Sequence, residues 1–565
     1  MTRVQTEYQL WLQDPAVDEQ TKQELQAIAG DEKEIEDRFY KDLEFGTGGL
    51  RGVIGAGTNR INVYTVGRAS QGLAQYVNGT GAANPAIVLA YDSRHMSPEF
   101  ALEAALVFAG NGIKAYLFRT LHATPQLSFA VRYLGARAGV VVTASHNPPE
   151  YNGYKVYGAD GGQLVPQFAE QVIDLVQSID SFDKVKKLSQ QEAEAQGLLV
   201  WLGEDVDQAY IQAVSAISQN PAIIKEISDD FRVVFTPLHG AGNVPVREVL
   251  QAVGFGQVRV VAEQELPDAQ FSTLKSPNPE EREAFTLAIA QAKAWDADII
   301  IGTDPDADRM GAVVKDPNGE YFVLTGNQSG AIIVNYLLSS MKERGTLPAN
   351  GVVIKTIVTS EMGAAIANHY GISTLNTLTG FKYIGEKMTQ YEQTGEHTFL
   401  FGYEESYGYL AGTYARDKDA VIASMLIAEA AAYYKKQGKT LYDVLQELYE
   451  SFGYFLEKLE SRTLKGKDGV EQIGRMMEAW RTNPPVEIGG TRVSSVEDYA
   501  QGIQGLPREN VLKFKMEDGS WFCLRPSGTE PKIKFYFAVQ GSTGPEAAER
   551  INGIIQYVLH RVDGK

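Results

Sequence analysis

The chain has 565 residues, of which 44% are hydrophobic and 22% are charged, with a formal net charge of -19, and a length beyond what one hydrophobic core serves predicts about four domains. The acidic balance argues against a nucleic-acid partner, because binding to a phosphate backbone relies on clustered Lys and Arg. The single cysteine, Cys523, excludes an intrachain disulfide and a cysteine-based zinc cluster, and a polar start with no stretch of ~20 apolar residues argues against export and a membrane partner and favours a cytoplasmic location.

The first recurring pattern begins at residue 86. A short apolar strand (86–91) is followed by Ser97-Pro98, which we interpret as the cap and first turn of a helix. A second strand (114–118) precedes a similar Thr124-Pro125 pair, and the next helix leads to the apolar strand 139–142. This β-α-β-α-β order predicts a largely parallel sheet.

The same order occurs twice more and then changes. The second unit is expected to contain strands 232–235, 258–261 and 298–301 with a helix over 279–293, and the third to contain strands 352–357, 373–378 and 398–401. The last stretch has strands 511–516, 521–524 and 532–539 before an amphipathic helix (545–560), which indicates a smaller α+β domain. We therefore predict three related α/β units with mixed, largely parallel sheets and a C-terminal α+β domain, with boundaries at 1–205, 206–322, 323–450 and 451–565.

Chemically reactive residues follow the third strand of each unit. In open parallel sheets, ligands bind in the crevice at the carboxyl ends of the strands. Ser145-His146 follows the first of these strands, residues 304–309 follow the second, and residues 404–406 follow the third. These three loops are the first candidates for a functional site.

The middle loop carries Asp304, Asp306 and Asp308, three carboxylates at alternate positions. Such a turn can direct several oxygens at one Mg²⁺ or Ca²⁺, and it can equally be a solvated acidic turn. An EF-hand is excluded, because Arg309 stands where that loop needs glycine and Lys315 where it needs a bidentate glutamate. Arg309 instead suits a site that holds a metal and a phosphate together.

Ser145 could be a nucleophile or a phosphoryl carrier, although a Ser-His pair in a loop is more often only a turn. The G-x-S-x-G sequence of serine hydrolases is absent around it, which disfavours acyl transfer. Phosphoryl transfer fits better, because it needs positioning, Mg²⁺ and cationic groups.

A phosphate-binding turn is a second candidate, in the terminal domain. Residues 525–532 run from Arg525 to Lys532 and are rich in hydroxyl, backbone and guanidinium donors that can cradle a phosphate. An ordinary β-turn between two strands is an equal alternative. The glycine-rich segment 45–52 does not match a Walker A loop.

Together with Gly46-Thr47-Gly48-Gly49-Leu50-Arg51-Gly52, these loops resemble the α-D-phosphohexomutase superfamily over nearly the whole chain. The resemblance implies four domains around a central cleft. It implies that Ser145 carries the phosphoryl group and that Asp304, Asp306 and Asp308 bind one Mg²⁺ together with an oxygen of the serine phosphate. The remaining implied residues are Arg51, His146, Lys155 and Arg309 at the reacting centre, Thr379, Gly380, Phe381, Lys382, Glu404 and Ser406 at the sugar, and Arg525, Ser527, Gly528, Thr529 and Lys532 at the distal phosphate.

The resemblance also implies a reaction, an isomerisation by intramolecular phosphotransfer through a sugar bisphosphate. Pro305 and Ala307 stand between the metal-loop aspartates, where many members have glycine, and this form is similar to a glucomutase and pentomutase branch. We therefore expect glucose 1-phosphate and glucose 6-phosphate as the substrate pair in glucose metabolism, with glucose 1,6-bisphosphate as intermediate and activator. The alternatives are pentose phosphates, mannose phosphates, a bisphosphate synthase or metal phosphatase, and a non-catalytic sugar-phosphate-binding protein.

Overall fold

The computed structural model describes residues 2–46, 48–464, 466–527 and 532–563. The first unit has a six-stranded sheet in the order β1-β5-β4-β2-β3-β6. Its strands are β1 (Leu50–Val53), β2 (Ala86–Tyr91), β3 (Lys114–Phe118), β4 (Ala138–Val142), β5 (Tyr151–Gly158) and β6 (Leu199–Leu202). Its helices are α1 (Arg3–Gln13), α2 (Glu19–Ala27), α3 (Glu32–Phe39), α4 (Val63–Gly79), α5 (Ser97–Gly110), α6 (Thr124–Tyr133), α7 (Pro166–Gln177) and α8 (Gln190–Ala195).

The second unit has a five-stranded sheet in the order β11-β10-β9-β7-β8, and the third has a four-stranded sheet in the order β13-β12-β14-β15. The second contains α9 (Glu204–Ser215), α10 (Pro221–Glu226), β7 (Arg232–Thr236), α11 (Asn243–Val253), β8 (Gln257–Val260), α12 (Ala262–Glu265), α13 (Thr286–Trp295), β9 (Ile299–Thr303), β10 (Met310–Lys315) and β11 (Tyr321–Val323). The third contains α14 (Gly326–Glu343), β12 (Gly351–Thr356), α15 (Met362–His369), β13 (Ser373–Thr377), α16 (Phe381–Thr394), β14 (Thr398–Glu404), β15 (Gly408–Ala411), α17 (Ala420–Lys435) and α18 (Leu441–Phe452).

The three units share one topology. In each, three parallel strands are followed by a strand that turns back antiparallel to the third: β5 after β4, β10 after β9 and β15 after β14. The third strands are buried along most of their length, as expected for strands covered on both faces. The loop after each third strand therefore occupies the same place in all three units.

The C-terminal unit is an antiparallel sheet in the order β16-β21-β20-β19-β18-β17. It consists of β16 (Tyr454–Thr463), α19 (Gly466–Thr482), β17 (Glu487–Ile488), β18 (Thr491–Asp498), β19 (Leu512–Met516), β20 (Trp521–Pro526), β21 (Lys532–Gly541) and α20 (Gly544–Val562). The predicted fold class is confirmed: three related α/β units with mixed sheets and a smaller C-terminal domain. Among the described residues, no helix combines the length and the apolar character needed to cross a membrane.

Some local predictions were wrong. The caps of α5 and α6 are Met96 and Ala123, because Ser97 and Thr124 lie inside the helices and use their hydroxyls to reach Asp92 and Asp306. The predicted helix over 279–293 begins later, since the Asn278 side chain accepts a hydrogen bond from the Glu280 N–H and forms a turn. The predicted domain boundaries after residues 205, 322 and 450 fall inside α9, β11 and α18, and they stay predictions.

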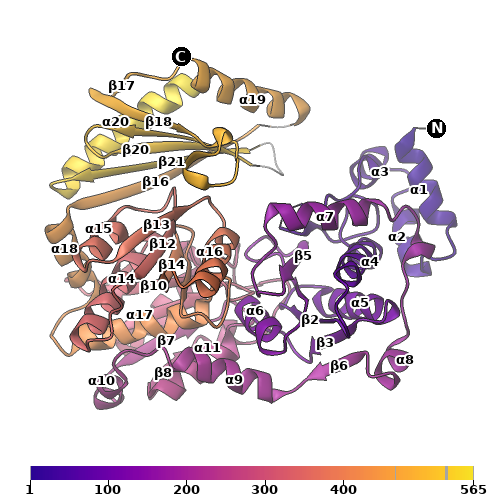
Figure 1. Cartoon of the computed structure of the whole chain (residues 1–565), viewed down its shortest axis with the longest axis horizontal. Helices are drawn as coiled ribbons and strands as arrows, with labels where there is room; N and C mark the ends of the chain where they lie inside the picture. The colour runs from indigo at the N-terminus through magenta and orange to yellow at the C-terminus, as the bar shows by residue number, and fades with distance from the viewer. Residues whose placement is uncertain (1, 47, 465, 528–531, 564–565) are drawn as a thin grey trace.

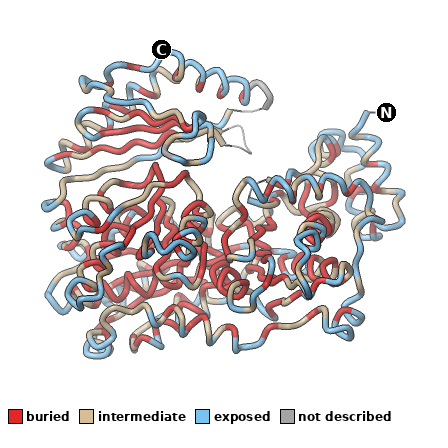
Figure 2. Tube along the Cα trace, in the orientation of Figure 1, coloured by how far each residue is buried: buried red, intermediate tan, exposed pale blue. Residues whose placement is uncertain are grey.

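A continuous core joins the three α/β units. One cluster of buried hydrophobic side chains includes Phe129 on α6, Tyr210 on α9, Val249 on α11 and Ile427 on α17. Figure 2 shows buried residues running through these units without a break, with exposed residues on the outer helices. The loops that follow the third strands are therefore held on a shared, packed base.

The C-terminal sheet packs on the third unit (Figure 1). Ile357 and Leu378 share a buried cluster with Trp521 and Tyr536. The Lys513 ammonium on β19 donates a 2.6 Å hydrogen bond to the Ile357 carbonyl. The C-terminal unit is thus attached to the end of β12 and to the segment that precedes α16.

Glu457 on β16 makes this interface sensitive to pH. Its Oε2 accepts a 3.3 Å hydrogen bond from Asn327, and its Oε1 is buried without a hydrogen-bond partner in the described part of the chain. Burial raises the pKa of Glu457 to about 7 from an ordinary 4.5. The folded state therefore favours the protonated acid, so this contribution to stability is fully present below pH 4.5 and is lost as the pH rises through about 7.

We expect Glu457→Gln, which mimics the neutral acid, to remove that dependence. Between pH 5 and pH 8 the wild-type free energy of unfolding should fall by about 3 kcal/mol more than that of the variant, by linkage to the pKa shift. Thermal unfolding of both proteins across this range measures the difference, with Glu478→Gln, at an exposed position of α19, as control. Equal pH slopes in wild type and Glu457→Gln would contradict the assignment.

Candidate active site

Three loops that follow the third strands meet at one place. The middle loop contacts both other units, because the Thr124 N–H at the start of α6 donates to the Asp306 carbonyl at 2.9 Å and the Ala420 N–H at the start of α17 donates to the Ala307 carbonyl at 3.1 Å. Arg309 pairs with Gly408 as an isolated β-bridge. The structure therefore brings together the loops in which we predicted Ser145, the aspartates and Glu404.

Ser145 is buried and points at the acidic loop. Its Oγ donates a 2.9 Å hydrogen bond to Asp304 Oδ2, and His146 Nδ1 lies 3.2 Å from the Ser145 Oγ. Its backbone has a φ of 53°, in the left-handed region that non-glycine residues adopt rarely and at a cost of ~1–2 kcal/mol. Such a conformation persists only where neighbouring groups hold it in place.

Arg94, which the sequence analysis missed, holds this loop. Its fully buried guanidinium lies against Asp92 Oδ2 at 3.3 Å and under the ring of Phe271 from the second unit, at 5.1 Å. The guanidinium donates to four backbone carbonyls of the loop, those of Ser145 (2.7 Å), Asn147, Pro148 (2.7 Å) and Tyr151 (3.0 Å). The sequence offered one indication of the role of Arg94, which is that Arg94 stands just after β2, at the same sheet edge as Ser145.

Asp304, Asp306 and Asp308 form a compact acidic cluster. All three are buried, and their ligand oxygens lie within 4.8 Å of one another. Asp304 Oδ1 accepts from the N–H groups of Asp308 and Arg309 at 3.1 and 3.0 Å. Burial and the charges of Asp306 and Asp308 raise the pKa of Asp304 well above its ordinary value.

The cluster fits a divalent cation. Among the described residues, the buried Oδ1 atoms of Asp306 and Asp308 have no hydrogen-bond partner. Arg309 Nε lies 3.8 Å from Asp308 Oδ1, which is too far for a hydrogen bond. Buried carboxylate oxygens are normally paired, and hard oxygens grouped in this way are the ligands that Mg²⁺ and Ca²⁺ prefer. The donor set therefore suits a metal of this class.

Two lysines balance the other side of the cluster. Lys155 Nζ on β5 donates to Asp306 Oδ2 at 2.7 Å and to Asp308 Oδ2 at 3.3 Å. Lys418 Nζ, after β15, lies 3.1 Å from Asp308 Oδ2. Although burial opposes the change, Lys418 and Lys155 lower the pKa of Asp308. Lys418 was missed in the sequence analysis, where the charged run of residues 416–419 was its only signal.

His146 lies among cations. Burial, with Arg309 and Arg51 nearby, lowers the pKa of His146 well below its usual value, so the imidazole is neutral. Arg309 is held by Glu280 through a 2.6 Å ion pair, and Arg51 lies on β1 opposite Gly153. All the residues predicted at the reacting centre therefore lie around Ser145 and the aspartates.

The glycine-rich segment brings Arg51 to the centre. At Gly49 the backbone has a φ of 100°, and a Cβ there would lie 1.9 Å from the Tyr154 carbonyl oxygen. Only glycine permits this approach of β1 to β5. The segment is thus a close strand contact, which places Arg51 next to the strand that carries Lys155.

The residues predicted at the sugar form a second group. Glu404 Oε1 accepts a 2.9 Å hydrogen bond from the Gly380 N–H, which joins β14 to the loop before α16. Burial raises the pKa of Glu404 to about 7, against the opposing charge of Lys418. Phe381 packs 5.8 Å below the Lys418 ammonium. Of the other predicted members, Thr379, Lys382 and Ser406 are each partly exposed.

The predicted phosphate turn lies on the C-terminal sheet. Arg525 lies near the end of β20 and donates to Glu509 at 3.2 Å, and the Ser527 N–H donates to the Lys532 carbonyl at 2.7 Å. Gly528 and Thr529 lie outside the described residues. Lys534, a further cation that we did not predict, lies opposite Arg525 on the neighbouring strand β21.

The turn acts on its neighbours through charge. Burial lowers the pKa of Lys534, and the nearby charge of Arg525 lowers it further. Lys532 and Arg309 act in the same direction. Arg525 also contributes to the lowered pKa of Lys382, which burial causes in the first place. The charge of the turn therefore acts on the first turn of α16, on a different domain from Ser145.

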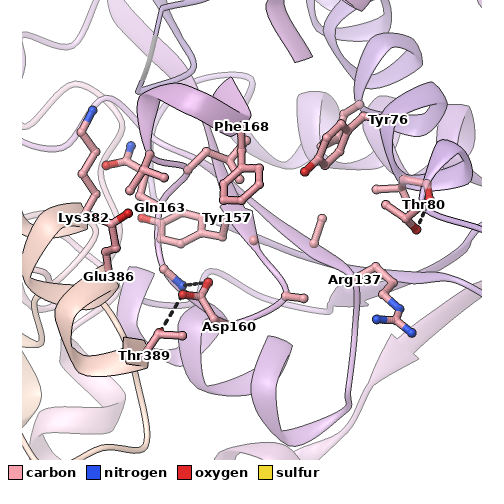
Figure 3. Close-up of a pocket in the computed structure, with 18 of the residues that line it drawn as sticks. Tyr76, Thr80, Arg137, Tyr157, Asp160, Gln163, Phe168, Lys382, Glu386 and Thr389 are labelled. Atoms are coloured by element: carbon pink, nitrogen blue, oxygen red, sulfur yellow. Dashed lines mark hydrogen bonds between the residues drawn. The ribbon is translucent and has the colours of Figure 1, made fainter. Parts of the chain in front are cut away.

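A separate pocket of about 410 Å³ lies between the first and third units (Figure 3). Its lining residues come from α4, β5, the following turn, α7 and α16, and include Tyr76, Tyr157, Phe168 and Lys382. Neither Ser145 nor the aspartates line it. The pocket adjoins the predicted sugar loop at Lys382 and is distinct from the reacting centre.

Comparison with known proteins agrees with this arrangement. Models of the phosphoglucomutase/phosphomannomutase family match all four parts of the chain: alpha/beta/alpha domain I (42–183), domain II (208–319), domain III (325–452) and the C-terminal domain (467–551). A phosphoglucomutase of Staphylococcus haemolyticus is 40% identical over 532 residues, which cover 92% of this chain and 94% of the relative.

Solved structures show the same fold. Parafusin, a phosphoglucomutase of Paramecium crystallised in an open form, superimposes with a TM-score of 0.70 at 17% identity, over 93% of this chain and 96% of its own. A phosphoglucomutase/phosphomannomutase family protein of Burkholderia thailandensis superimposes with a TM-score of 0.65 at 18% identity, over 91% and 96%. The resemblance predicted from the sequence is confirmed, and the chain belongs to the phosphoglucomutase/phosphomannomutase family.

Proposed function

We propose that this chain is a phosphoglucomutase, an isomerase that interconverts glucose 1-phosphate and glucose 6-phosphate by intramolecular phosphotransfer. The observation that carries the proposal is Ser145, whose buried Oγ lies 2.9 Å from Asp304 within a cluster of three carboxylates and two lysines. The relatives named phosphoglucomutase support glucose phosphate over the alternatives. Phosphoryl transfer depends on positioning and charge, and this centre supplies both.

The reaction consists of two phosphoryl transfers, one from Ser145 to the sugar and one from the sugar back to Ser145. Phospho-Ser145 transfers its phosphoryl group to the free hydroxyl of a glucose monophosphate, which breaks the Oγ–P bond and forms glucose 1,6-bisphosphate. The bisphosphate reorients, and its other phosphoryl group returns to Ser145, which leaves the isomeric monophosphate. This scheme requires one reacting centre and one remote phosphate site, and holding the substrate at both converts encounters into an effectively unimolecular reaction.

We assign the remote site to Arg525, Ser527, Lys532 and Lys534, with Gly528 and Thr529 as further members. Arg525 and Lys534 are paired across β20 and β21, and their side chains are partly buried. Guanidinium and ammonium donors of this kind bind phosphate through charge-assisted hydrogen bonds. Glu404 accepts a hydrogen bond from Gly380, and Arg525 lies close enough to Lys382 to contribute to the lowering of its pKa, which burial causes in the first place. We assign Glu404, Ser406 and the 379–382 loop to the sugar.

At the reacting centre, Asp304, Asp306 and Asp308 would hold one Mg²⁺ together with an oxygen on Ser145. When bound there, Mg²⁺ polarises a phosphoryl oxygen and neutralises charge during transfer. Lys155, Arg309 and Arg51 supply fixed positive charge beside the transferred group. His146, which is neutral and 3.2 Å from Ser145 Oγ, can hold or release a proton at that oxygen.

The experiment that tests the proposal measures turnover of glucose 1-phosphate and ribose 1-phosphate side by side, with Mg²⁺ and catalytic glucose 1,6-bisphosphate. We expect faster conversion of glucose 1-phosphate. A preference for ribose 1-phosphate would replace the proposal with a phosphopentomutase on the same machinery. Turnover of neither would overturn both and direct the test to mannose phosphate.

We also propose a cytoplasmic location. The single cysteine, Cys523, is buried and unpaired, which is compatible with the reducing conditions of the cytosol.

A further inference from the structure

Polar contacts form a seam between the first and third units. Glu392 on α16 accepts from Arg132 on α6 at 2.9 and 3.1 Å and from Arg416 at 2.7 Å. Thr389 donates to Asp160 at 2.8 Å, beside the pocket of Figure 3. These contacts lie near the surface of the molecule, because the side chain of Glu392 is 48% exposed.

One contact of the seam is different, because it leads inward. The Tyr157 hydroxyl on β5 donates a 2.7 Å hydrogen bond to Asp417 Oδ2 in the third unit. The other oxygen, Asp417 Oδ1, accepts from the Lys418 ammonium at 3.1 Å and from the Lys418 N–H at 2.8 Å. The same ammonium lies 3.1 Å from Asp308 Oδ2 in the second unit. A single line of contacts therefore joins all three α/β units and ends at the acidic loop.

All members of this line are shielded from water. Tyr157 is fully buried, Asp417 is 2% exposed, and the side chain of Lys418 is 13% exposed. A buried carboxylate needs a donor for each oxygen, and here Tyr157 serves Oδ2 while Lys418 serves Oδ1. Loss of the Tyr157 hydroxyl would leave Oδ2 unpaired and allow the carboxyl group to turn away from Lys418.

Lys418 needs such a partner to keep its place. A lysine side chain has four rotatable bonds, and fixing it in one conformation costs up to ~2 kcal/mol. Asp417 and Asp308 hold its ammonium from two sides, while the Phe381 ring packs against it at 5.8 Å. Because Asp308 also belongs to the predicted metal site, Asp417 is the partner that holds Lys418 independently of that site.

We propose that Asp417 and Tyr157 are positioning residues that hold the Lys418 ammonium beside Asp308, so that the fit between the first and third units sets the geometry of the reacting centre. This inference rests on the proposed function for its kinetic consequences. Neither residue touches the reacting atoms. Both act through Lys418.

The kinetic test compares Tyr157→Phe, Asp417→Asn and the double variant with wild type. Residues that support a site indirectly cost 10- to 100-fold in activity when removed, so we expect kcat for glucose 1-phosphate to fall about 10-fold in Tyr157→Phe and about 100-fold in Asp417→Asn, with KM within about twofold. Because both act through one lysine, the double variant should fall no further than Asp417→Asn. Independent, multiplying losses would overturn the proposal.

The matched control is Arg132→Gln, which weakens the same seam at Glu392 and touches nothing in the line to Lys418. We expect it to lower the melting temperature and leave kcat unchanged. If Arg132→Gln reduces kcat as much as Tyr157→Phe, the line has no role beyond holding the units together.

Crystal structures of the variants make the test independent of activity. The inference expects Lys418 Nζ to leave hydrogen-bond distance of Asp308 in Asp417→Asn and to remain there in Arg132→Gln. An unmoved Lys418 in Asp417→Asn would overturn the inference, even in a protein that turns over glucose 1-phosphate. An inactive wild-type protein with a displaced Lys418 in the variant would instead overturn the proposed function alone.

Discussion

Replacing Ser145 with alanine is expected to abolish turnover of glucose 1-phosphate. The Ser145 Oγ is the oxygen that would receive and return the phosphoryl group, and alanine offers no replacement. The fold should survive, because the variant loses only the buried hydrogen bond to Asp304, at a cost of about 1–3 kcal/mol, and the longer 3.2 Å contact with His146. Arg94 still holds the loop carbonyls, so the left-handed backbone at position 145 remains supported.

Two measurements check this expectation. A coupled assay follows glucose 6-phosphate formation, and intact-mass spectrometry after incubation with glucose 1,6-bisphosphate reports the gain of one phosphoryl group. The matched control is Ser70→Ala, which removes a buried hydroxyl of the same unit, 2.9 Å from Tyr154 and outside the site. It should keep both turnover and phosphorylation. Turnover in Ser145→Ala, or phosphorylation of that variant to the wild-type level, would remove Ser145 from the mechanism.

The part of the site that could be predicted from the sequence consists of short contiguous motifs. Ser145-His146 and the aspartates 304–308 stand directly after buried apolar strands, so strand pattern and local chemistry were sufficient to single them out. The three-unit fold was predictable for the same reason, since its parallel strands are short apolar runs between helices. The roles of these residues came from the resemblance, and they stay predictions.

What could not be predicted depends on contacts between segments far apart in the chain. Arg94 reaches the Ser145 carbonyl across 51 positions, and Lys418 reaches Asp308 from another unit. Neither has a local pattern that separates it from a surface cation. The strand β16 was missed for a different reason, because as an edge strand it is half exposed and its alternation of charged residues resembles a linker.

Asp306→Asn is the second change with a large expected effect, because it should impair metal binding while leaving the fold intact. Asp306 Oδ2 accepts from Thr124 and Lys155, which an asparagine oxygen can still do, while its Oδ1 has no hydrogen-bond partner among the described residues. The variant removes one of three buried negative charges. We therefore expect the metal-free protein to keep its melting temperature, and turnover to fall about 1,000-fold because one ligand of the proposed Mg²⁺ is lost.

Thermal unfolding with and without Mg²⁺ detects metal binding independently of an activity assay. A ligand present at 100 times its dissociation constant stabilises a fold by about 2.7 kcal/mol, so wild type should melt at a higher temperature in Mg²⁺ than in a chelator. Asp306→Asn should lose this rise, whereas Asp296→Asn, at an exposed position of the same unit, should keep it. If Asp306→Asn retains the full Mg²⁺ response, the unpaired Asp306 Oδ1 serves some purpose other than metal binding.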